Sequence, residues 1–379
     1  MTEPISGSRL FNALKDEETI IMACNTRTTV GVVKGIFRAA KELDAAVIME
    51  LAKSESDLNG GYTGITPEMY GKETRKYSSE IGFDCWALHA DHITMKKGTP
   101  EEIEETKKLI EAQVNAGYTS FAIDASFLFN EEGATVEEQL AENIRVTIEL
   151  AKFIEEKMGE KEFGLECEVG EIGKKDSDGR ILTKPEEAVA FVKALEAAGV
   201  RPHGIAIANG SAHGNTYDAE GKLIEQVSID IPQTIKVAEA LRGEDSNVRV
   251  VQHGITGTPI ELIASKFPKK AIIKGNVGTE WQNVVWSVLE EKEPELYKEI
   301  FDWTMGKYRE EAEGKGMKSD VEIFGKYSKK AWKPFYDKIH SLKPETVKAI
   351  EEKAYSRAKE FFEAFGAVGS GEKVRNYKG

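Results

Sequence analysis

Short apolar segments recur along the chain, separated by longer segments in which apolar residues fall at helical spacing. An apolar run of roughly 4–8 residues between polar positions is typical of a strand buried on both faces. The segments of this kind lie at residues 19–25, 45–52, 85–92, 120–126, 163–170, 204–209, 248–253 and 271–276. Most of them end in a polar residue, such as Asn25 or His92.

The segments between these runs carry signals for the start of a helix. Thr99 can cap a helix, Pro100 suits its first position, and Glu102 completes a capping box. Similar starts are expected at Thr183 and Thr258. Eight strands alternating with helices predict an α/β fold, a (β/α)8 TIM barrel. A doubly wound open sheet is the alternative, but the first strand–helix turn, C-N-T-R-T-T-V-G, lacks a G-x-G-x-x-G pattern.

The end of the chain differs from the rest. After about residue 303 the sequence is charged and helical, without strand-like runs. We therefore expect a barrel domain at residues 1–303. A helical extension at residues 304–379 would pack on the barrel or on a neighbouring subunit.

Charge and cysteine usage narrow the class of protein. A formal net charge of −14 opposes binding to nucleic acid or to anionic membranes. A phosphorylated ligand would therefore need a locally built anion site. The cysteines Cys24, Cys85 and Cys167 each lie in an apolar run, which suggests reduced, buried thiols. With no signal-peptide core and no apolar run of membrane-spanning length, we expect a cytoplasmic protein.

Three histidines share a setting at strand ends. His92 ends the third strand, His213 follows the sixth, and His253 ends the seventh. A single histidine there is more often structural, but in a barrel the carboxyl ends of the strands meet at one mouth. Three imidazoles with an open fourth position make a catalytic zinc site. Gly214 and Gly254, directly after two of these histidines, permit a close backbone approach.

The other histidines have weaker claims. His89 lies three residues before His92, so in a regular strand it points to the opposite face. His203 precedes its strand, at the wrong end of the barrel, and His340 lies in the helical tail. We expect structural roles for the first two and assign none to His340.

Carboxylates lie at the same strand ends. Asp91 is adjacent to His92 and can face a substrate while the histidine faces a metal. Asp124 and Glu168 can orient imidazole N–H groups or bind a second cation, with buried salt bridges as the alternative. Glu166 is expected to be an ion-pair partner in the core.

Six motifs, in order and each at a strand end, resemble the class II, metal-dependent fructose-bisphosphate aldolases, including the tagatose-bisphosphate type. The resemblance covers roughly residues 10–290. The segments that carry it are A-L-H-A-D-H-I, F-A-I-D-A-S, L-E-C-E-V-G-E-I-G, A-N-G-S-A-H-G, V-V-Q-H-G-I-T-G-T-P and I-I-K-G-N-V-G-T-E-W.

The resemblance implies a role for each matching residue. His92, His213 and His253 would bind one catalytic Zn²⁺. Asp91 would be the acid/base near the C4 hydroxyl, and Asn276 would contact the enediolate. Asp124 and Glu168 would surround the metal or its alternative position, where a second divalent or monovalent cation could bind. The residues that would border the substrate and its phosphates are Asn25, Ser54, Gly214, Gly254, Thr256, Gly257, Asn276 and Thr279. A homo-oligomer and a place in glycolysis and gluconeogenesis are also expected.

One departure from the family concerns the catalytic loop. Where the family carries two glycines and a glutamate, this chain reads G-K-K-D-S-D-G-R. Asp176 takes the glutamate's place as the group that moves the proton of the dihydroxyacetone carbon. Asp178 and Glu171 remain alternatives.

Other departures touch the phosphates. Ile255 and Thr256 replace a glycine and a serine, Gly278 replaces an aspartate, and a lysine is missing after Gly214, although Lys222 lies nearby. The cations that could replace this lysine are Lys174, Lys175 and Arg180. None of these changes touches a proposed zinc ligand.

Three functions therefore compete. The first is zinc-dependent cleavage of a phosphorylated ketose: fructose 1,6-bisphosphate, or else tagatose bisphosphate or a sulfosugar phosphate. The second is a Schiff-base aldolase using Lys274, expected at the end of the eighth strand, where nothing obvious depresses a lysine pKa. The third is a non-catalytic sugar- or metal-binding protein, which would have no evident use for Asp91 beside His92.

Overall fold

Eight parallel strands close into a barrel in the computed structural model, which describes residues 2–171, 175–176 and 179–379. Around the barrel the order is β1-β12-β11-β8-β5-β4-β3-β2. The strands are β1 (Ile21–Asn25), β2 (Val47–Ala52), β3 (Trp86–Thr94), β4 (Ser120–Asp124), β5 (Gly164–Glu168), β8 (Gly204–Ala206), β11 (Arg249–Gln252) and β12 (Ile272–Val277). Each falls within or overlaps an expected apolar run, and the predicted TIM barrel is confirmed.

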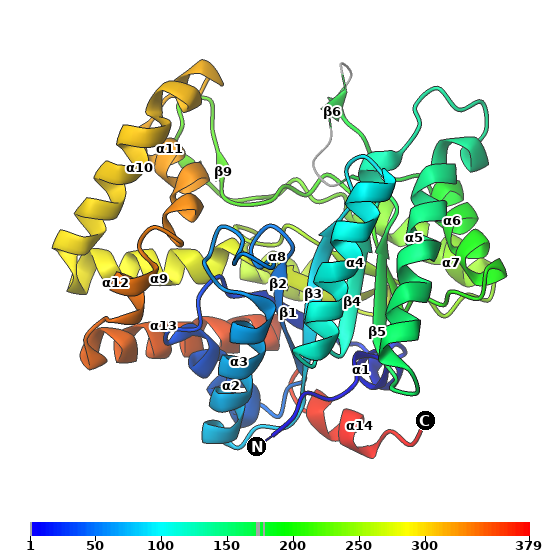
Figure 1. Cartoon of the computed structure of the whole chain (residues 1–379), viewed down its shortest axis with the longest axis horizontal. Coiled ribbons are helices and arrows are strands. Elements are labelled where there is room, and N and C mark those ends of the chain that lie inside the picture. The colour runs from blue at the N-terminus through cyan, green and yellow to red at the C-terminus, as the bar shows by residue number, and fades with distance from the viewer. Residues whose placement is uncertain (1, 172–174, 177–178) are drawn as a thin grey trace.

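Helices that follow the strands cover the outside of the barrel (Figure 1). They are α2 (Val32–Glu42), α3 (Pro67–Ile81), α4 (Pro100–Asn115), α5 (Val136–Met158), α6 (Pro185–Ala197), α7 (Ile231–Gly243), α8 (Ile260–Lys266) and α9 (Thr279–Lys292). Thr99 caps α4 as expected, accepting a hydrogen bond from the backbone N–H of Glu102. The other two expected caps are wrong by one residue, because α6 is preceded by Lys184 and α8 by Pro259.

The N-terminal end of the barrel is closed by α1 (Gly7–Leu14). The backbone N–H of Gly7 donates to the carbonyl of Thr119 just before β4, at 3.0 Å. His203 lies at this end, stacked on Phe11 with ring centroids 5.5 Å apart. Its Nδ1 accepts from the backbone N–H of Leu165 at 3.2 Å, so this histidine is structural, as expected.

The C-terminal helices pack on the barrel of the same chain. They are α10 (Pro294–Gly314), α11 (Asp320–Tyr327), α12 (Tyr336–His340), α13 (Pro344–Ala364) and α14 (Ser370–Asn376). Helix α13 lies along α2 so closely that a Cβ on Gly35 would collide with the backbone of α13. In Figure 1, α10 and α11 rise beside the barrel mouth, and α14 lies below it near α1. The helical segment begins at Pro294, since α10 runs through the expected boundary at residue 303.

Short elements surround the mouth of the barrel. They are η1 (Ser126–Leu128), η2 (Ser328–Ala331) and two hairpins, β6 (Lys175–Asp176) with β7 (Gly179–Arg180) and β9 (Thr216–Tyr217) with β10 (Leu223–Ile224). All three cysteines are free and buried, as expected. Among the described helices, none is both long enough and apolar enough to cross a membrane.

Candidate active site

A cavity of about 580 Å³ opens at the carboxyl ends of the strands. It collects nearly all the site residues expected from the sequence: Asn25, Ser54, Asp91, His92, Asp124, Glu168, Glu171, His213, Gly214, His253, Gly254, Thr256, Asn276 and Thr279. Gly257 is not among the lining residues; its carbonyl instead accepts a hydrogen bond from the backbone N–H of Gln226.

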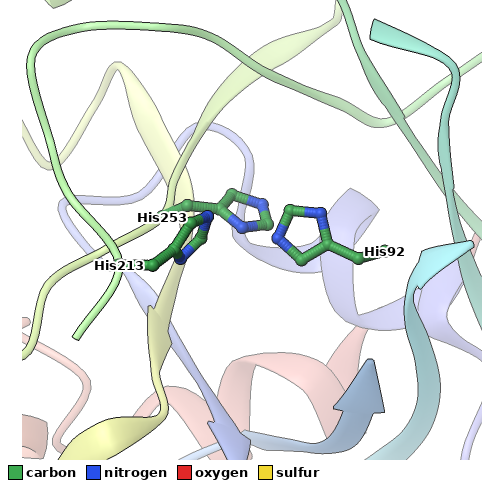
Figure 2. A group of neighbouring side chains, drawn as sticks. All are labelled: His92, His213 and His253. Carbon is green, nitrogen blue, oxygen red and sulfur yellow. The ribbon is translucent and has the colours of Figure 1, made fainter. Parts of the chain in front are cut away.

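Three imidazoles face one another in this cavity (Figure 2). The ring centroids of His92 and His253 are 4.4 Å apart, those of His92 and His213 5.4 Å, and those of His213 and His253 6.1 Å. One nitrogen from each ring lies within 4.8 Å of one nitrogen from each of the others. This spacing allows one ion to contact all three rings.

The hydrogen bonds of these rings leave nitrogens available for an ion. Nε2 of His253 pairs with Oε1 of Glu166 at 2.9 Å, while its buried Nδ1 has no partner within the described part of the chain. Nδ1 of His92 lies 3.3 Å from Oδ2 of Asp124 and 3.2 Å from Oε2 of Glu168. Imidazoles anchored in this way on carboxylates are typical of metal ligands. The unpartnered Nδ1 and the three-nitrogen set therefore fit a zinc ion.

The backbone at His92 explains how two adjacent residues both reach the cavity. His92 has a φ of 40°, and the pairing of β3 with β4 shifts register between Ala90 and Ile93. This irregularity ends the alternation of side chains along the strand. The expectation that His89 and His92 point to opposite faces is therefore wrong. His89 also points into the barrel, with Nε2 3.2 Å from Nζ of Lys274 and Nδ1 2.7 Å from Oγ of Ser120.

Asp91 is held by amide groups from two other strands. Its Oδ2 accepts from Nδ2 of Asn25 at 2.9 Å, and its Oδ1 accepts from Nδ2 of Asn276 at 3.2 Å. Burial alone would raise the pKa of Asp91, but the neighbouring positive charges of His92 and Lys274 outweigh it and lower that pKa. The arrangement keeps an anionic carboxylate next to the three-histidine group.

The sequence as a whole matches the family described as "Fructose-bisphosphate aldolase class-II" over residues 6–370. The chain belongs to this family of aldehyde-lyases. A fructose-bisphosphate aldolase of Geobacillus stearothermophilus is 26% identical over 276 residues, which is 70% of this chain and 78% of that protein. The family is metal-dependent, and the three-histidine group supplies candidate ligands.

Solved structures share the fold of this aldolase. The YdjI aldolase of Escherichia coli K12 superposes with a TM-score of 0.60 at 18% identity, covering 96% of this chain and 98% of that one. The fructose-bisphosphate aldolase of Campylobacter jejuni superposes with a TM-score of 0.62 at 20% identity, covering 97% of both chains. These likenesses establish the barrel with its C-terminal helices.

Lys274 is placed differently from the expectation. It lies inside β12 rather than at its end, fully buried, with Nζ 2.6 Å from Oε2 of Glu166 and 3.1 Å from Oε2 of Glu50. Burial opposes its charge, but the carboxylates of Glu166 and Glu50 outweigh burial and raise its pKa. A Schiff-base lysine must be neutral and accessible, so this geometry does not support that alternative. Glu166 is an ion-pair partner in the core, as expected, and in addition anchors His253.

Two buried carboxylates beside His92 offer a second position for a cation. Oxygens of Asp124 and Glu168 form a close group with a nitrogen of His92. Burial, reinforced by the charge of Asp124, raises the pKa of Glu168 to about 8. An added cation would relieve this repulsion between neighbouring carboxylates.

The turns after β11 and β12 meet at the start of α9. The hydroxyl of Thr256 accepts from the backbone N–H of Glu280 at 3.2 Å and so caps this helix. A Cβ on Gly214 would lie 3.9 Å from the hydroxyl of Thr279, so these residues border the same space. Helix N-termini attract anions, and this corner of the aldolase is suited to a phosphate.

Several cavity residues were missed from the sequence. Arg27, Glu55, Tyr62 and Lys329 all line it. Arg27 could have been noticed, since it lies two residues after Asn25 in the first strand–helix turn. Lys329 could not, because it comes from η2 in the C-terminal helical segment, whose placement over the mouth depends on tertiary packing.

Some expected residues fall where little is described. Asp176 lies in β6, but its side chain, like those of Lys175 and Arg180, lies outside the described structure, and so do Asp178 and Lys174 as whole residues. The roles expected for them therefore stay predictions. Glu171 does line the cavity, while Lys222 is bound through its backbone N–H to Asp218 in the β9–β10 hairpin.

Proposed function

We propose that this aldolase uses zinc and reversibly cleaves a phosphorylated ketose, fructose 1,6-bisphosphate, to dihydroxyacetone phosphate and glyceraldehyde 3-phosphate. The observation that carries the proposal is the buried Nδ1 of His253, which has no hydrogen-bond partner among the residues that the structure describes. It faces the imidazoles of His92 and His213, and the amide-held carboxylate of Asp91 lies beside them.

The bound ion would act as a Lewis acid, polarising the ketose carbonyl and stabilising the negative charge of the enediolate. Asp91 removes the proton of the C4 hydroxyl as the bond between C3 and C4 breaks, and C4 becomes the aldehyde carbon. In condensation the same carboxyl returns that proton. Nδ2 of Asn276 is bound to Glu50 and Asp91, whereas its buried Oδ1 has no partner among the described residues. This oxygen is suited to accept a hydrogen bond from a hydroxyl of the enediol.

A carboxylate of the loop after β5 delivers the proton to C3 after cleavage. We assign this role to Asp176, with Asp178 and Glu171 as alternatives. In deuterated water, replacement of the correct residue by its amide would suppress exchange at this carbon of dihydroxyacetone phosphate. Replacement of either other acid would leave that exchange intact.

Local donors would bind the phosphate of the dihydroxyacetone half. A net charge of −14 gives no general attraction for a bisphosphate, so binding depends on such donors. The start of α9, with Thr256 and Thr279, supplies backbone N–H groups and hydroxyls, and Gly214 and Gly254 leave room for the ligand. Asn25 and Ser54 would border the other half of the substrate.

The decisive experiment measures dihydroxyacetone phosphate released from a panel of ketoses by zinc-loaded and chelator-treated protein. The panel contains fructose 1,6-bisphosphate, tagatose 1,6-bisphosphate, fructose 1-phosphate and a sulfonated analogue. Ile255, Gly278 and the missing lysine are the observations that favour a ketose other than fructose 1,6-bisphosphate. Release that depends on zinc supports the proposal. If zinc-loaded protein binds these sugars but releases no dihydroxyacetone phosphate, the non-catalytic alternative holds instead.

A second cation, divalent or monovalent, could bind at Asp124 and Glu168. The protein would act in the cytoplasm, on small phosphorylated sugars rather than nucleic acid or membranes. It would form a homo-oligomer, a dimer or larger, which sedimentation of the purified protein would measure.

A further inference from the structure

An arginine faces the open space beside Gly278. A Cβ built on Gly278 would lie 3.7 Å from Nη2 of Arg27 and 3.4 Å from Cβ of Asn25. Both Gly278 and Arg27 line the cavity. At this place the cavity therefore combines the positive charge of Arg27 with free space beside its guanidinium.

The guanidinium is held from behind by two neighbours. Nε donates to Oε1 of Glu55 at 2.9 Å, and Nη1 donates to Oε1 of Gln282 at 3.1 Å. The backbone of Arg27 has a φ of 59°, a left-handed conformation that costs a non-glycine residue free energy. Glu55 is itself fixed by the hydroxyl of Tyr62 at 2.8 Å and by the backbone N–H of Ala52 at 2.9 Å. The arginine is thus fixed before any ligand binds.

A second cation lies on the same side of the cavity. Lys329 of η2 lines it and, within the described part of the chain, has no salt bridge. Its Nζ lies over the ring of Tyr62, 5.9 Å from the centroid. Burial and the nearby charge of Arg27 lower the pKa of Lys329, which an anion between the two cations would reverse. Glu55 balances one of these two charges, so the pair still carries a net positive charge.

Hydrogen bonds connect this cation pair to the proposed acid. Nδ2 of Asn25 donates to Oδ2 of Asp91 at 2.9 Å and lies 3.3 Å from Oε2 of Glu55. Since Asp91 would act on the C4 hydroxyl, a group bound at Arg27 would belong to the end of the ketose that leaves as the aldehyde. The phosphate of the dihydroxyacetone half would bind elsewhere, at Thr256 and Thr279.

We infer that Arg27 and Lys329 bind an anionic group at the aldehyde end of the ketose, a phosphate monoester, in the space left open by Gly278. This inference rests on the proposed aldolase function and makes Arg27 a determinant of substrate choice. The planar fork of a guanidinium suits two oxygens of such a group. A sulfonate offers similar oxygens, so the experiment must separate the two.

The test runs the reaction in the direction of synthesis. Zinc-loaded protein condenses dihydroxyacetone phosphate with glyceraldehyde 3-phosphate, with neutral glyceraldehyde, or with an aldehyde that carries a sulfonate. The variants are R27N, which suits the left-handed backbone, and K329M, with K330M as the matched control because Lys330 is an exposed neighbour. The double variant E55Q/R27N removes the buried carboxylate together with its partner, in case R27N alone folds poorly.

We expect R27N and K329M to raise KM for glyceraldehyde 3-phosphate roughly 10- to 100-fold, as for loss of a charge-assisted hydrogen bond. KM for neutral glyceraldehyde should change far less, and K330M should resemble the wild type. A wild-type preference for the sulfonated aldehyde that R27N removes would support the site with sulfonate as its anion. An equal rise in KM for the charged and the neutral aldehyde would overturn the inference. So would a raised KM for dihydroxyacetone phosphate alone. If the wild type condenses no aldehyde at all, the proposed function fails as well.

Discussion

Nζ of Lys274 lies 2.6 Å from Oε2 of Glu166, and Oε1 of the same carboxylate lies 2.9 Å from Nε2 of His253. A single buried carboxylate therefore joins a charged lysine in the core to an imidazole at the barrel mouth. If Nε2–H of His253 donates to Glu166, Nδ1 keeps its lone pair and faces His92 and His213. The ion pair in the core thus prepares the ring for a metal before the metal binds.

Removal of the buried ammonium should destabilise the protein strongly. K274M would leave Glu166, Glu50 and Asp91 without their shared cation, and breaking a buried pair costs about 3–5 kcal/mol. Urea unfolding should show this loss, and K274M/E166Q should recover part of it.

Borohydride added with substrate should leave Lys274 of the wild type unmodified. A labelled Lys274 peptide would contradict the metal mechanism.

His203 should make folding stability depend on pH independently of the active site. Burial lowers its pKa from 6.5 to about 4 in the folded chain. The unfolded chain therefore binds more protons between these values, and the stabilisation present above pH 6.5 is lost as the pH falls toward 4. The stabilisation lost in this way is at most roughly 3–4 kcal/mol.

H203N is the matched variant for this prediction, since an amide oxygen can still accept from the backbone N–H of Leu165. Urea unfolding with chelator at pH 7 and pH 4.5 should give a smaller difference for H203N than for the wild type. The comparison uses this difference rather than absolute stability, because H203N also loses the stacking on Phe11. Equal differences for the two proteins would show that His203 does not titrate as described.

Much of the fold was predictable because buried strands leave a simple apolar pattern. The runs at 45–52 and 120–126, for example, correspond to β2 and β4, and the polar residues that end such runs lie at the mouth. The three histidines come together for the same reason. The apolar pattern and the direction of the strands were therefore enough to predict that the three histidines lie together.

The errors arose where local rules break down. The left-handed backbone of His92 interrupts alternation, so His89 was assigned to the wrong face. Lys274 was placed at a strand end because an apolar run does not reveal where its strand stops. Lys329 was missed because its position at the mouth depends on how η2, which follows α11, packs against the rest of the chain. These are properties of tertiary packing, which a single sequence carries only indirectly.

His213 should be necessary for metal binding. H213A removes one of the three proposed imidazole ligands, so the variant should lose both the proposed zinc ion and aldol cleavage. Metal analysis after dialysis and the cleavage assay measure both. H340A is the control, because His340 lies in α12 with Nδ1 bound to the carbonyl of Tyr336. Full zinc content and turnover in H213A would refute the ligand assignment.

Asp91 should separate chemistry from metal binding. D91N has nearly the same shape, but it replaces one carboxylate oxygen, which accepts from Asn25 or Asn276, by an amide that cannot act as a base. General acid–base catalysis contributes roughly 10²–10⁴-fold, so kcat should fall by about that factor. Zinc content should stay at the wild-type level, because the carboxylate is offered as a proton carrier and His92, His213 and His253 would bind the ion. Metal analysis of the same preparation used for the rate measurement decides between the two roles. Zinc lost in proportion to activity would make Asp91 a ligand or a support for His92 instead.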